Sequence, residues 1–298
     1  MKIGQLLNKP EYLFRPIQIF RRLVHSHRVQ DLMPARLPWG GKLYVQPTDA
    51  IGKSILTLGV HELAVSEVLW RLTDEGDTCI DVGANIGYVT ALLSTRVGTT
   101  GRVISFEPHP QIFEKLRTNV RFMNNRSSVT IVECAIGAID GDTDLCEPLG
   151  FATNEGTSSI AFPLSRGPEC GNRYPIKVRR LDSIFSGDEQ IGVAKIDVEG
   201  AELEVFQGAE SLLRARNIRD VIWENNNNFT PQLLRLFSDC GYNVFRFSKG
   251  IFGPVLWDPA SLENQHRSAP WETHNLLATH ELTRALARLS RRGWQCLA

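Results

Sequence analysis

Strand-length apolar runs alternate with helical stripes in the second quarter of the chain. Residues 78–82, 102–107 and 129–134 have the length and apolar content of buried strands. Between them, residues 88–97 and 110–123 repeat apolar side chains at the spacing of a helix that covers a core. Strands that alternate with helices in this way pair parallel with one another. The pattern therefore predicts an α/β fold with a parallel sheet.

The alternation of strands and helices stops at about residue 136 and resumes at about residue 190. Within 136–190, turns separate short runs of alternating apolar and polar side chains, which indicates an antiparallel insertion before the fourth strand. The α/β pattern then resumes with five predicted elements: a strand at 193–197, a helix at 201–216, a strand at 220–224, a helix at 231–240 and a strand at 242–247. We therefore expect one main domain over residues 46–298, interrupted by the insertion.

The first 45 residues stand apart from this pattern. Residues 1–30 contain six lysines and arginines against the single acid Glu11, and their apolar side chains recur at roughly helical spacing. We interpret residues 1–45 as a basic amphipathic extension. A helix of this kind either packs its apolar face on the domain, which we prefer, or makes weak peripheral contact with a membrane. No compact apolar run ends in a small-residue cleavage site, so we expect no secretory signal.

Charge and cysteine content narrow the function classes. Lysine plus arginine equals aspartate plus glutamate at 33 each among 298 residues, so no net field favours nucleic acid as a partner. We expect a small-molecule or glycan substrate instead. The six cysteines include no C-x-x-C pair and predict buried thiols in a reducing, cytoplasmic compartment. No stretch approaches the roughly 20 apolar residues that a membrane-spanning helix needs.

The loop after the first predicted strand carries the first candidate site, because ligands of open parallel sheets bind beyond the carboxyl ends of the strands. Asp81 stands near that end, and Gly83 and Gly87 allow the backbone to approach a ligand closely. Asn85 occupies the place of the second glycine in the nicotinamide fingerprint G-x-G-x-x-G. An acid at position 81 suits the ammonium group of a methionine moiety. The loop therefore favours S-adenosylmethionine over a dinucleotide, with a plain loop cap as the alternative for Asp81.

Three further residues are predicted to bind the cofactor. Glu107 ends the second strand, twenty residues after Gly87, where an acid accepts hydrogen bonds from ribose hydroxyl groups. Glu62 precedes an amphipathic helix that would cover the methionine end of the cofactor, and a cap of that helix is the alternative. Ala135 follows the third strand at the same edge of the sheet.

Acidic residues also follow the fourth and fifth predicted strands. Asp197 and Glu199 lie where the fourth strand meets a helix, and Glu224 ends the fifth strand. We expect the ends of these two strands to be neighbours, which would bring the three acids to the transferred methyl group as catalytic residues. Compensation of the helix dipole is the alternative, above all for Glu202.

Two mechanisms would activate a neutral alcohol at such a site. In the first, a carboxylate, foremost Asp197, accepts the hydroxyl proton as a general base. In the second, Asp197, Glu224 and Asn225 hold a divalent cation that lowers the pKa of the hydroxyl group. We prefer the base and predict no metal ligand, because Asn225 opens a run of four asparagines and is weak evidence for a ligand.

Two motifs give the chain a resemblance to a known family. The segment D-T-C-I-D-V-G-A-N-I-G-Y at 77–88 and the segment K-I-D-V-E-G-A-E at 195–202 are similar to motifs of the FkbM family of methyltransferases. The resemblance covers about residues 50–250. It implies a Rossmann-like class I methyltransferase fold, with a mostly parallel seven-stranded sheet and helices on both faces. It also implies S-adenosylmethionine as cofactor and O-methylation of a hydroxyl on a sugar, lipid-linked glycan or polyketide-type molecule.

Other interpretations stay open beside this one. The same sheet would suit a nicotinamide-dependent oxidoreductase or a nucleoside-binding protein without catalysis. His61 and His109 are expected to be surface or loop histidines. The loop 154–159 is rich in hydroxyl and amide groups suited to a glycan, although ordinary turns have the same composition.

Overall fold

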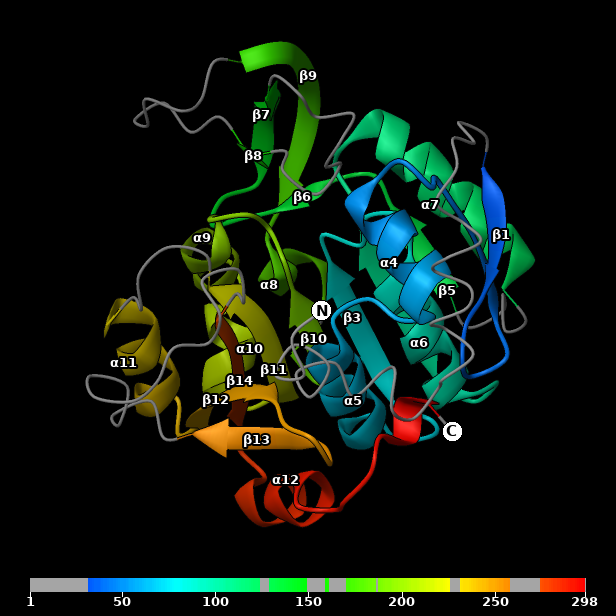
Figure 1. The fold of residues 1–298 in the computed structure, drawn as a ribbon. Coiled ribbons are helices and arrows are strands. Elements are labelled where there is room, and N and C mark those ends of the chain that lie inside the picture. The colour runs from blue at the N-terminus through cyan, green and yellow to red at the C-terminus, as the bar shows by residue number, and fades with distance from the viewer. Residues whose placement is uncertain are drawn as a thin grey trace.

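The main sheet has eight strands within the residues that the computed structural model describes, namely 32–123, 129–148, 159–160, 170–185, 187–225, 231–257 and 274–297. Across the sheet the strands are β13 (Pro254–Trp257), β12 (Asn243–Lys249), β14 (His274–Thr279), β11 (Ile218–Asn225), β10 (Ile191–Ile196), β3 (Thr78–Val82), β4 (Arg102–Phe106) and β5 (Val129–Val132). The five strands from β11 to β5 are parallel, and β14 is antiparallel to both of its neighbours (Figure 1). The mostly parallel α/β sheet is thus confirmed. It has one strand more than the predicted seven, because β13 pairs with β12 as a hairpin.

Helices cover both faces of this sheet, as expected. One face packs against α5 (Leu63–Leu72), α6 (Tyr88–Val97) and α12 (Leu282–Leu289). The other face packs against α8 (Leu181–Ile184), α9 (Glu202–Gln207), α10 (Glu210–Arg214) and α11 (Pro231–Asp239). Neighbouring residues of one strand serve opposite faces: Cys79 belongs to the first cluster and Ile80 to the second. This alternation explains why the central strands are apolar along their whole length.

The predicted insertion forms a second, smaller sheet. Its strands, in order, are β6 (Ala135–Ile136), β9 (Cys170–Arg179), β7 (Gly141–Pro148) and β8 (Ser159–Ile160). The long strands β7 and β9 pair antiparallel, as predicted, whereas the short β6 pairs parallel with β9. In Figure 1 the insertion stands at the top of the molecule, on the side away from α12.

The single helix predicted over 201–216 is wrong, because the chain forms α9 and α10 with a break between them. The break contains Gly208, where a Cβ atom would overlap the carbonyl oxygen of Gly137 in the insertion. After the break, the carboxylate of Asp182 accepts hydrogen bonds from the backbone nitrogens of Ser211 and Leu212, at 3.1 Å each. The contact with the insertion and this new helix start together explain the interruption.

Residues 33–45 fold as a hairpin of β1 (Met33–Arg36) and β2 (Lys42–Val45). The apolar side chains of this hairpin are buried with those of α4 (Ala50–Leu58) and of the start of α6. Asn119 of α7 (Pro110–Phe122) fixes the hairpin through hydrogen bonds with the backbone nitrogen and carbonyl oxygen of Tyr44. The most basic part of the predicted extension, residues 1–31, lies outside the described residues.

The cysteines only partly match the expectation of free, buried thiols. Cys79, Cys134, Cys240 and Cys296 are free and buried, as predicted. Cys146, on β7 of the insertion, is disulfide-bonded, so the prediction is wrong for this residue. In the part of the chain that the structure describes, no helix is both long and apolar enough to cross a membrane.

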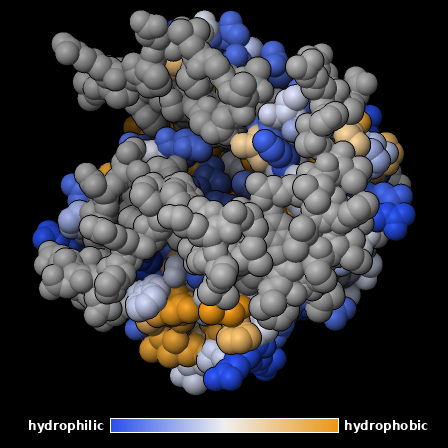
Figure 2. Space-filling view, viewed as in Figure 1, coloured by the Kyte–Doolittle hydropathy of each residue, from blue (hydrophilic) through white to orange (hydrophobic). Residues whose placement is uncertain are grey.

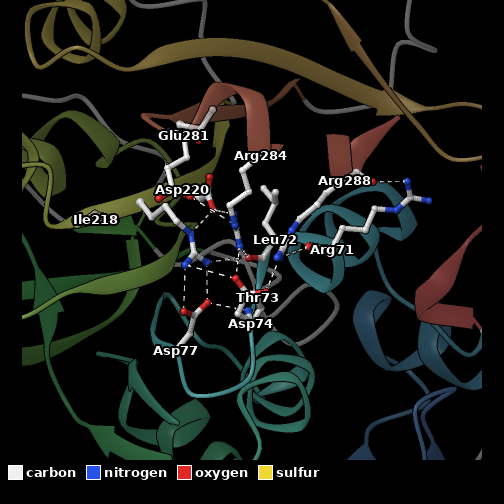
Figure 3. A network of polar contacts seen from close by, with 12 residues as sticks. Arg71, Leu72, Thr73, Asp74, Asp77, Ile218, Asp220, Glu281, Arg284 and Arg288 are labelled. Atoms are coloured by element: carbon white, nitrogen blue, oxygen red, sulfur yellow. Dashed lines mark hydrogen bonds and ion pairs between the residues drawn. The ribbon is translucent and has the colours of Figure 1, made fainter. Parts of the chain in front are cut away.

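An ion-pair network joins α12 to the edge of the sheet at which β3 and β11 begin (Figure 3). Arg284 and Arg288 of α12 each donate to Asp74 at 2.6 Å. Arg284 also donates to Asp220 at 2.9 Å, and Asp220 accepts from Arg219 at 3.0 Å. Desolvation alone would raise the pKa of Asp74, but the two arginines of α12 lower it below its ordinary value. The network therefore fixes the last helix on the amino-terminal side of the strands.

Exposed apolar side chains gather near the edge strand β13 and helix α12, in the lower part of the face drawn in Figure 2. The large exposed side chains of these elements and of the β12–β13 turn are Ile251, Phe252, Val255, Trp257 and Leu286. An edge strand exposes backbone N–H and C=O groups that have no partner strand. In β13 the number of such groups is small, because the strand has only four residues.

Candidate functional site

A cavity of about 310 Å³ lies at the carboxyl ends of β3, β4 and β10. Nine predicted site residues line it: Glu62, Asp81, Gly83, Asn85, Ala135, Glu107, Asp197, Glu199 and Glu224. Gly87 is not among its lining residues. It precedes α6 with a φ of +92°, and a Cβ atom there would lie 2.7 Å from the side chain of Leu116. Gly87 therefore lets α6 pack closely on α7 and does not border the cavity.

The loop after β3 is held by the neighbouring strands. The backbone nitrogens of Gly83 and Ala84 donate to the carbonyl oxygen of Phe106 at 2.9 and 3.0 Å. Gly83 has a φ of +77°, and a Cβ atom there would overlap the carbonyl oxygen of Asp197. The glycine is thus required for contact between two backbone segments, a reason that the spacing of the motif does not reveal. This contact brings the ends of β3 and β10 together at the cavity.

Glu107 joins two loops at the end of β4. Its Oε2 accepts from the backbone nitrogen of Asn85, and its Oε1 accepts from that of His109, at 2.9 Å each. Burial raises the pKa of Glu107 to about 7, although the two backbone hydrogen bonds oppose this rise. Pro108 and Ala135, which line the cavity beside it, make this wall apolar. A carboxylate next to an apolar wall suits a ribose whose base lies against that wall.

Asp81 is fully buried and fixed by a residue that the sequence reasoning missed. Thr90 of α6 donates its hydroxyl proton to Oδ2 of Asp81 at 2.6 Å, and its own oxygen lies 2.9 Å from the hydroxyl of Ser105. Burial raises the pKa of Asp81 to about 6, while the hydrogen bond from Thr90 lowers it. Thr90 lies nine positions after Asp81, so no spacing rule for the loop would identify it.

Lys195 is the second residue that the sequence reasoning missed, although it belongs to the quoted motif. Its side chain is buried on β10, and Nζ lies 3.0 Å from Oδ2 of Asp197. Burial disfavours the charged ammonium, but the carboxylates of Asp197, Glu62 and Asp81 outweigh this effect and raise the pKa of Lys195. A lysine inside an apolar strand run was the signal that could have predicted a buried ion pair.

The remaining acids differ in their surroundings. Oε1 of Glu202 accepts from the backbone nitrogen of Gly200 at 3.0 Å, which supports the interpretation of Glu202 as a helix-start residue. Glu199 lines the cavity, and its pKa is raised to about 7. Burial is the largest cause, and the negative charges of Asp197 and Glu202 raise the pKa further. Glu224 is buried at the end of β11 and also lines the cavity.

Backbone strain is concentrated at this cavity. Four non-glycine residues in the described part have a positive φ, and three of them line the cavity: Glu62 at +47°, Asn85 at +49° and Glu199 at +50°. Such conformations cost free energy and persist where the surrounding structure enforces them, often at functional sites. Glu62 occupies the N-cap position of α5, but its side chain makes no hydrogen bond that caps the helix.

Both histidines lie in loops, which is one of the two positions expected for them. His109 is fully buried, so the other expected position, at the surface, is wrong for this residue. Its Nδ1 accepts from the backbone nitrogen of Gln111 at the start of α7, and Nε2 lies 3.3 Å from Glu147 of the insertion. His61 lines the cavity, and its ring meets that of Tyr88 edge-on with centroids 6.1 Å apart. The candidate glycan loop at 154–158 lies outside the described residues, and of residue 159 only the backbone is described.

The charge of the cavity selects among ligands. Six of its lining residues are acids, whereas Lys195 is the one lysine or arginine among those that the structure describes. The diphosphate of a nicotinamide dinucleotide would meet these carboxylates as like charges. A nucleoside that carries a sulfonium and an ammonium group suits these carboxylates, because its positive charges are opposite to theirs.

Known proteins match this chain over the same region. The family model described as the Methyltransferase FkbM domain matches residues 81–244. The methyltransferase sdnD of Sordaria araneosa is 27% identical over 197 residues, which are 56% of this chain and 74% of that protein. The hexuronic acid methyltransferase AglP of Haloferax volcanii is 31% identical over 159 residues, which are 52% of this chain and 59% of that protein. The 31-O-demethyl-FK506 methyltransferase FkbM of Streptomyces tacrolimicus is 28% identical over 174 residues, or 50% and 65% of the two chains.

The family model covers more than half of this chain and includes the loop after β3, Glu107, the acidic motif and Glu224. The matched region thus supplies most of the residues that line the cavity. The protein therefore belongs to the FkbM family of methyltransferases, enzymes that use S-adenosylmethionine as cofactor.

Proposed function

We propose that the protein is an O-methyltransferase that transfers the methyl group of S-adenosylmethionine to a hydroxyl group of a sugar, glycan or polyketide-type small molecule. The observation that carries the proposal is the convergence of carboxylates from four parallel strands and from the segment before α5 on one cavity. The names of two relatives support the acceptor class, since one acts on hexuronic acid and the other on a 31-O-demethyl compound.

The residues of the cavity divide between the parts of the cofactor. Glu107 would accept hydrogen bonds from the ribose hydroxyls, and the apolar wall beside it would cover the base. Asp81 and Glu62 would face the charged methionine end, where their carboxylates offset its positive charge. Bound there, S-adenosylmethionine would supply an electrophilic methyl group.

The acceptor would enter beside the insertion. Leu145 of β7 lines the cavity together with Ile136 of β6, so the insertion supplies one of its walls. A neutral alcohol is a poor nucleophile and needs a group that removes its proton. The candidates for this proton acceptor are the acids that follow β10 and the acid near the end of β11. The rest of the protein's contribution is to align the acceptor oxygen with the methyl group.

The arrangement favours a protein base over a divalent cation. Asp197, the first ligand of the alternative metal site, is already paired with the ammonium of Lys195 at 3.0 Å. A cation would have to displace that ammonium or share its carboxylate. Of Asn225, the third candidate ligand, the structure describes only the backbone, at the end of β11.

The proposed activity is tested by transfer of a labelled methyl group from S-adenosylmethionine to hydroxyl acceptors, including hexuronic acids and polyketide alcohols. We expect the label in a methyl ether and an unchanged rate after exhaustive chelation with EDTA. Label found only on amines would contradict O-methylation. Loss of turnover in EDTA with recovery in Mg²⁺ would replace the base by the cation.

Cofactor affinity provides a separate prediction for Glu107. The variant Glu107→Gln should bind S-adenosylmethionine more weakly by about 1 to 3 kcal/mol in calorimetry, because a charged acceptor for the ribose hydroxyls is lost. The matched control is Glu114→Gln, an exposed acid of α7 that pairs with Arg117. Equal affinities of the two variants would remove Glu107 from the cofactor site.

A further inference from the structure

We propose that Glu199 accepts the proton of the acceptor hydroxyl and that Lys195 is a positioning residue that holds Asp197 in an ion pair. The two carboxylates of the motif D-V-E would then have different tasks. The inference rests on the proposed O-methylation and adds to it the identity of the base and a role for a buried lysine.

The surroundings of Lys195 show why Asp197 is held in an ion pair. Lys195 lies on a central strand between β3 and β11, opposite Asp81 of β3, and only 2% of its surface is exposed. An ammonium that water cannot reach needs an anionic partner, and Asp197 lies 3.0 Å from it. Oδ2 of Asp197 is therefore engaged by the ammonium group of Lys195.

Glu199 lies two residues further along in a different environment. Its backbone has a φ of +50°, followed by Gly200 at +101°, and its side chain lines the cavity. Burial and the carboxylates of Asp197, Glu202 and Glu62 raise its pKa to about 7, whereas Lys195 lowers it. A general base is most effective when its pKa is near the working pH. The strained turn therefore places a carboxylate with suitable basicity in the cavity.

The acceptor oxygen forms a bond to the methyl carbon while the bond from that carbon to sulfur breaks, and the bonding pair remains on sulfur. The hydroxyl proton passes to the carboxylate of Glu199 and then to water. The products are a methyl ether, S-adenosylhomocysteine and one released proton.

The pH dependence follows from the groups that face Glu199. The other titratable side chains that line the cavity are His61, Glu62, Asp81, Tyr88, Glu107, Cys134, Lys195, Asp197 and Glu224, and Glu202 lies beside them on α9. As pH falls through about 7, Glu199 becomes protonated and the rate should fall with it. Removal of the Lys195 charge should raise the pKa of Glu199, so the acidic limb should move to higher pH.

The first test measures the variant Glu199→Gln. Its kcat should fall by roughly 10²-fold or more, the scale of a lost general base. Its affinity for S-adenosylhomocysteine should stay within about threefold of the original protein, since no binding contact is assigned to Glu199. The matched control is Glu204→Gln, an acid of the following helix α9 that does not line the cavity, and it should retain kcat. A wild-type rate in Glu199→Gln, together with a lost rate in Asp197→Asn, would overturn the proposal.

The second test needs no turnover and separates this inference from the proposed function. Carbon-13 labels in the glutamate carboxyl groups of the cofactor-free protein should show two groups that titrate near pH 7, Glu107 and Glu199, and the resonance of Glu199 is the one that is absent in Glu199→Gln. In Lys195→Met that resonance should titrate at higher pH, and the acidic limb of kcat should move with it. An unchanged resonance in Lys195→Met would reject the role of Lys195, whether or not a hydroxyl acceptor is found. Absence of methyl transfer to any hydroxyl, with this titration present, would reject the proposed function instead.

Discussion

Gly83→Ala should abolish cofactor binding and lower the free energy of unfolding by at least about 3 kcal/mol. Gly83 has a φ of +77°, which an alanine adopts only with strain. The added Cβ would also overlap the carbonyl oxygen of Asp197, a backbone atom that no side-chain rotation can move. The ends of β3 and β10 would have to separate, and the carboxylates of the cavity would separate with them. Urea unfolding and calorimetry with S-adenosylmethionine measure the two effects.

Gly76→Ala is the matched control for this prediction. Gly76 has a similar φ of +85°, but the nearest atom to an added Cβ would be Oγ1 of Thr100 at 3.7 Å. Only the conformational strain applies there, about 1 to 2 kcal/mol, and cofactor affinity should not change. Equal losses of stability in the two variants would show that the overlap with Asp197 relaxes at no cost.

Arg71→Met should have the second large effect, a loss of about 3 to 5 kcal/mol in the free energy of unfolding. Arg71 is buried on α5, pairs with Glu67 at 2.6 Å and donates to the carbonyl oxygens of Leu289, the last residue of α12, and of Gly293. Glu67 in turn accepts from the backbone nitrogen of Cys296 at 2.8 Å. Methionine would fill the space but leave a buried carboxylate without its cation and several carbonyl groups without a donor.

Arg214→Met is the control, because Arg214 and Glu210 form an exposed pair with the same spacing of four residues on α10. Exposed pairs contribute little, so its urea midpoint should stay close to that of the original protein. A similarly small effect of Arg71→Met would mean that the last segment of the chain is held by its apolar contacts and by the network around Asp74 (Figure 3).

The lengths of the apolar runs predict that Asp81, Glu107 and Asp197 lie at strand ends, because the rules involved are local. The three residues line one cavity, since the ends of parallel strands meet at one edge of the sheet. The break between α9 and α10 could not be predicted in this way. It depends on Gly208 lying against the carbonyl of Gly137, a residue that is distant in the sequence.

The sequence by itself determined the alternation of strands and helices and the acids at the strand ends, since hydrophobic periodicity and motif spacing are properties of neighbouring positions. The tertiary structure decided which of these groups touch. Lys195 pairs with Asp197, and Thr90 holds Asp81 by a hydrogen bond. His109 is buried, and Gly87 is not among the residues that line the cavity. Such contacts depend on strand register and helix packing, which are set by the free energy of the whole core and not by any local run of residues.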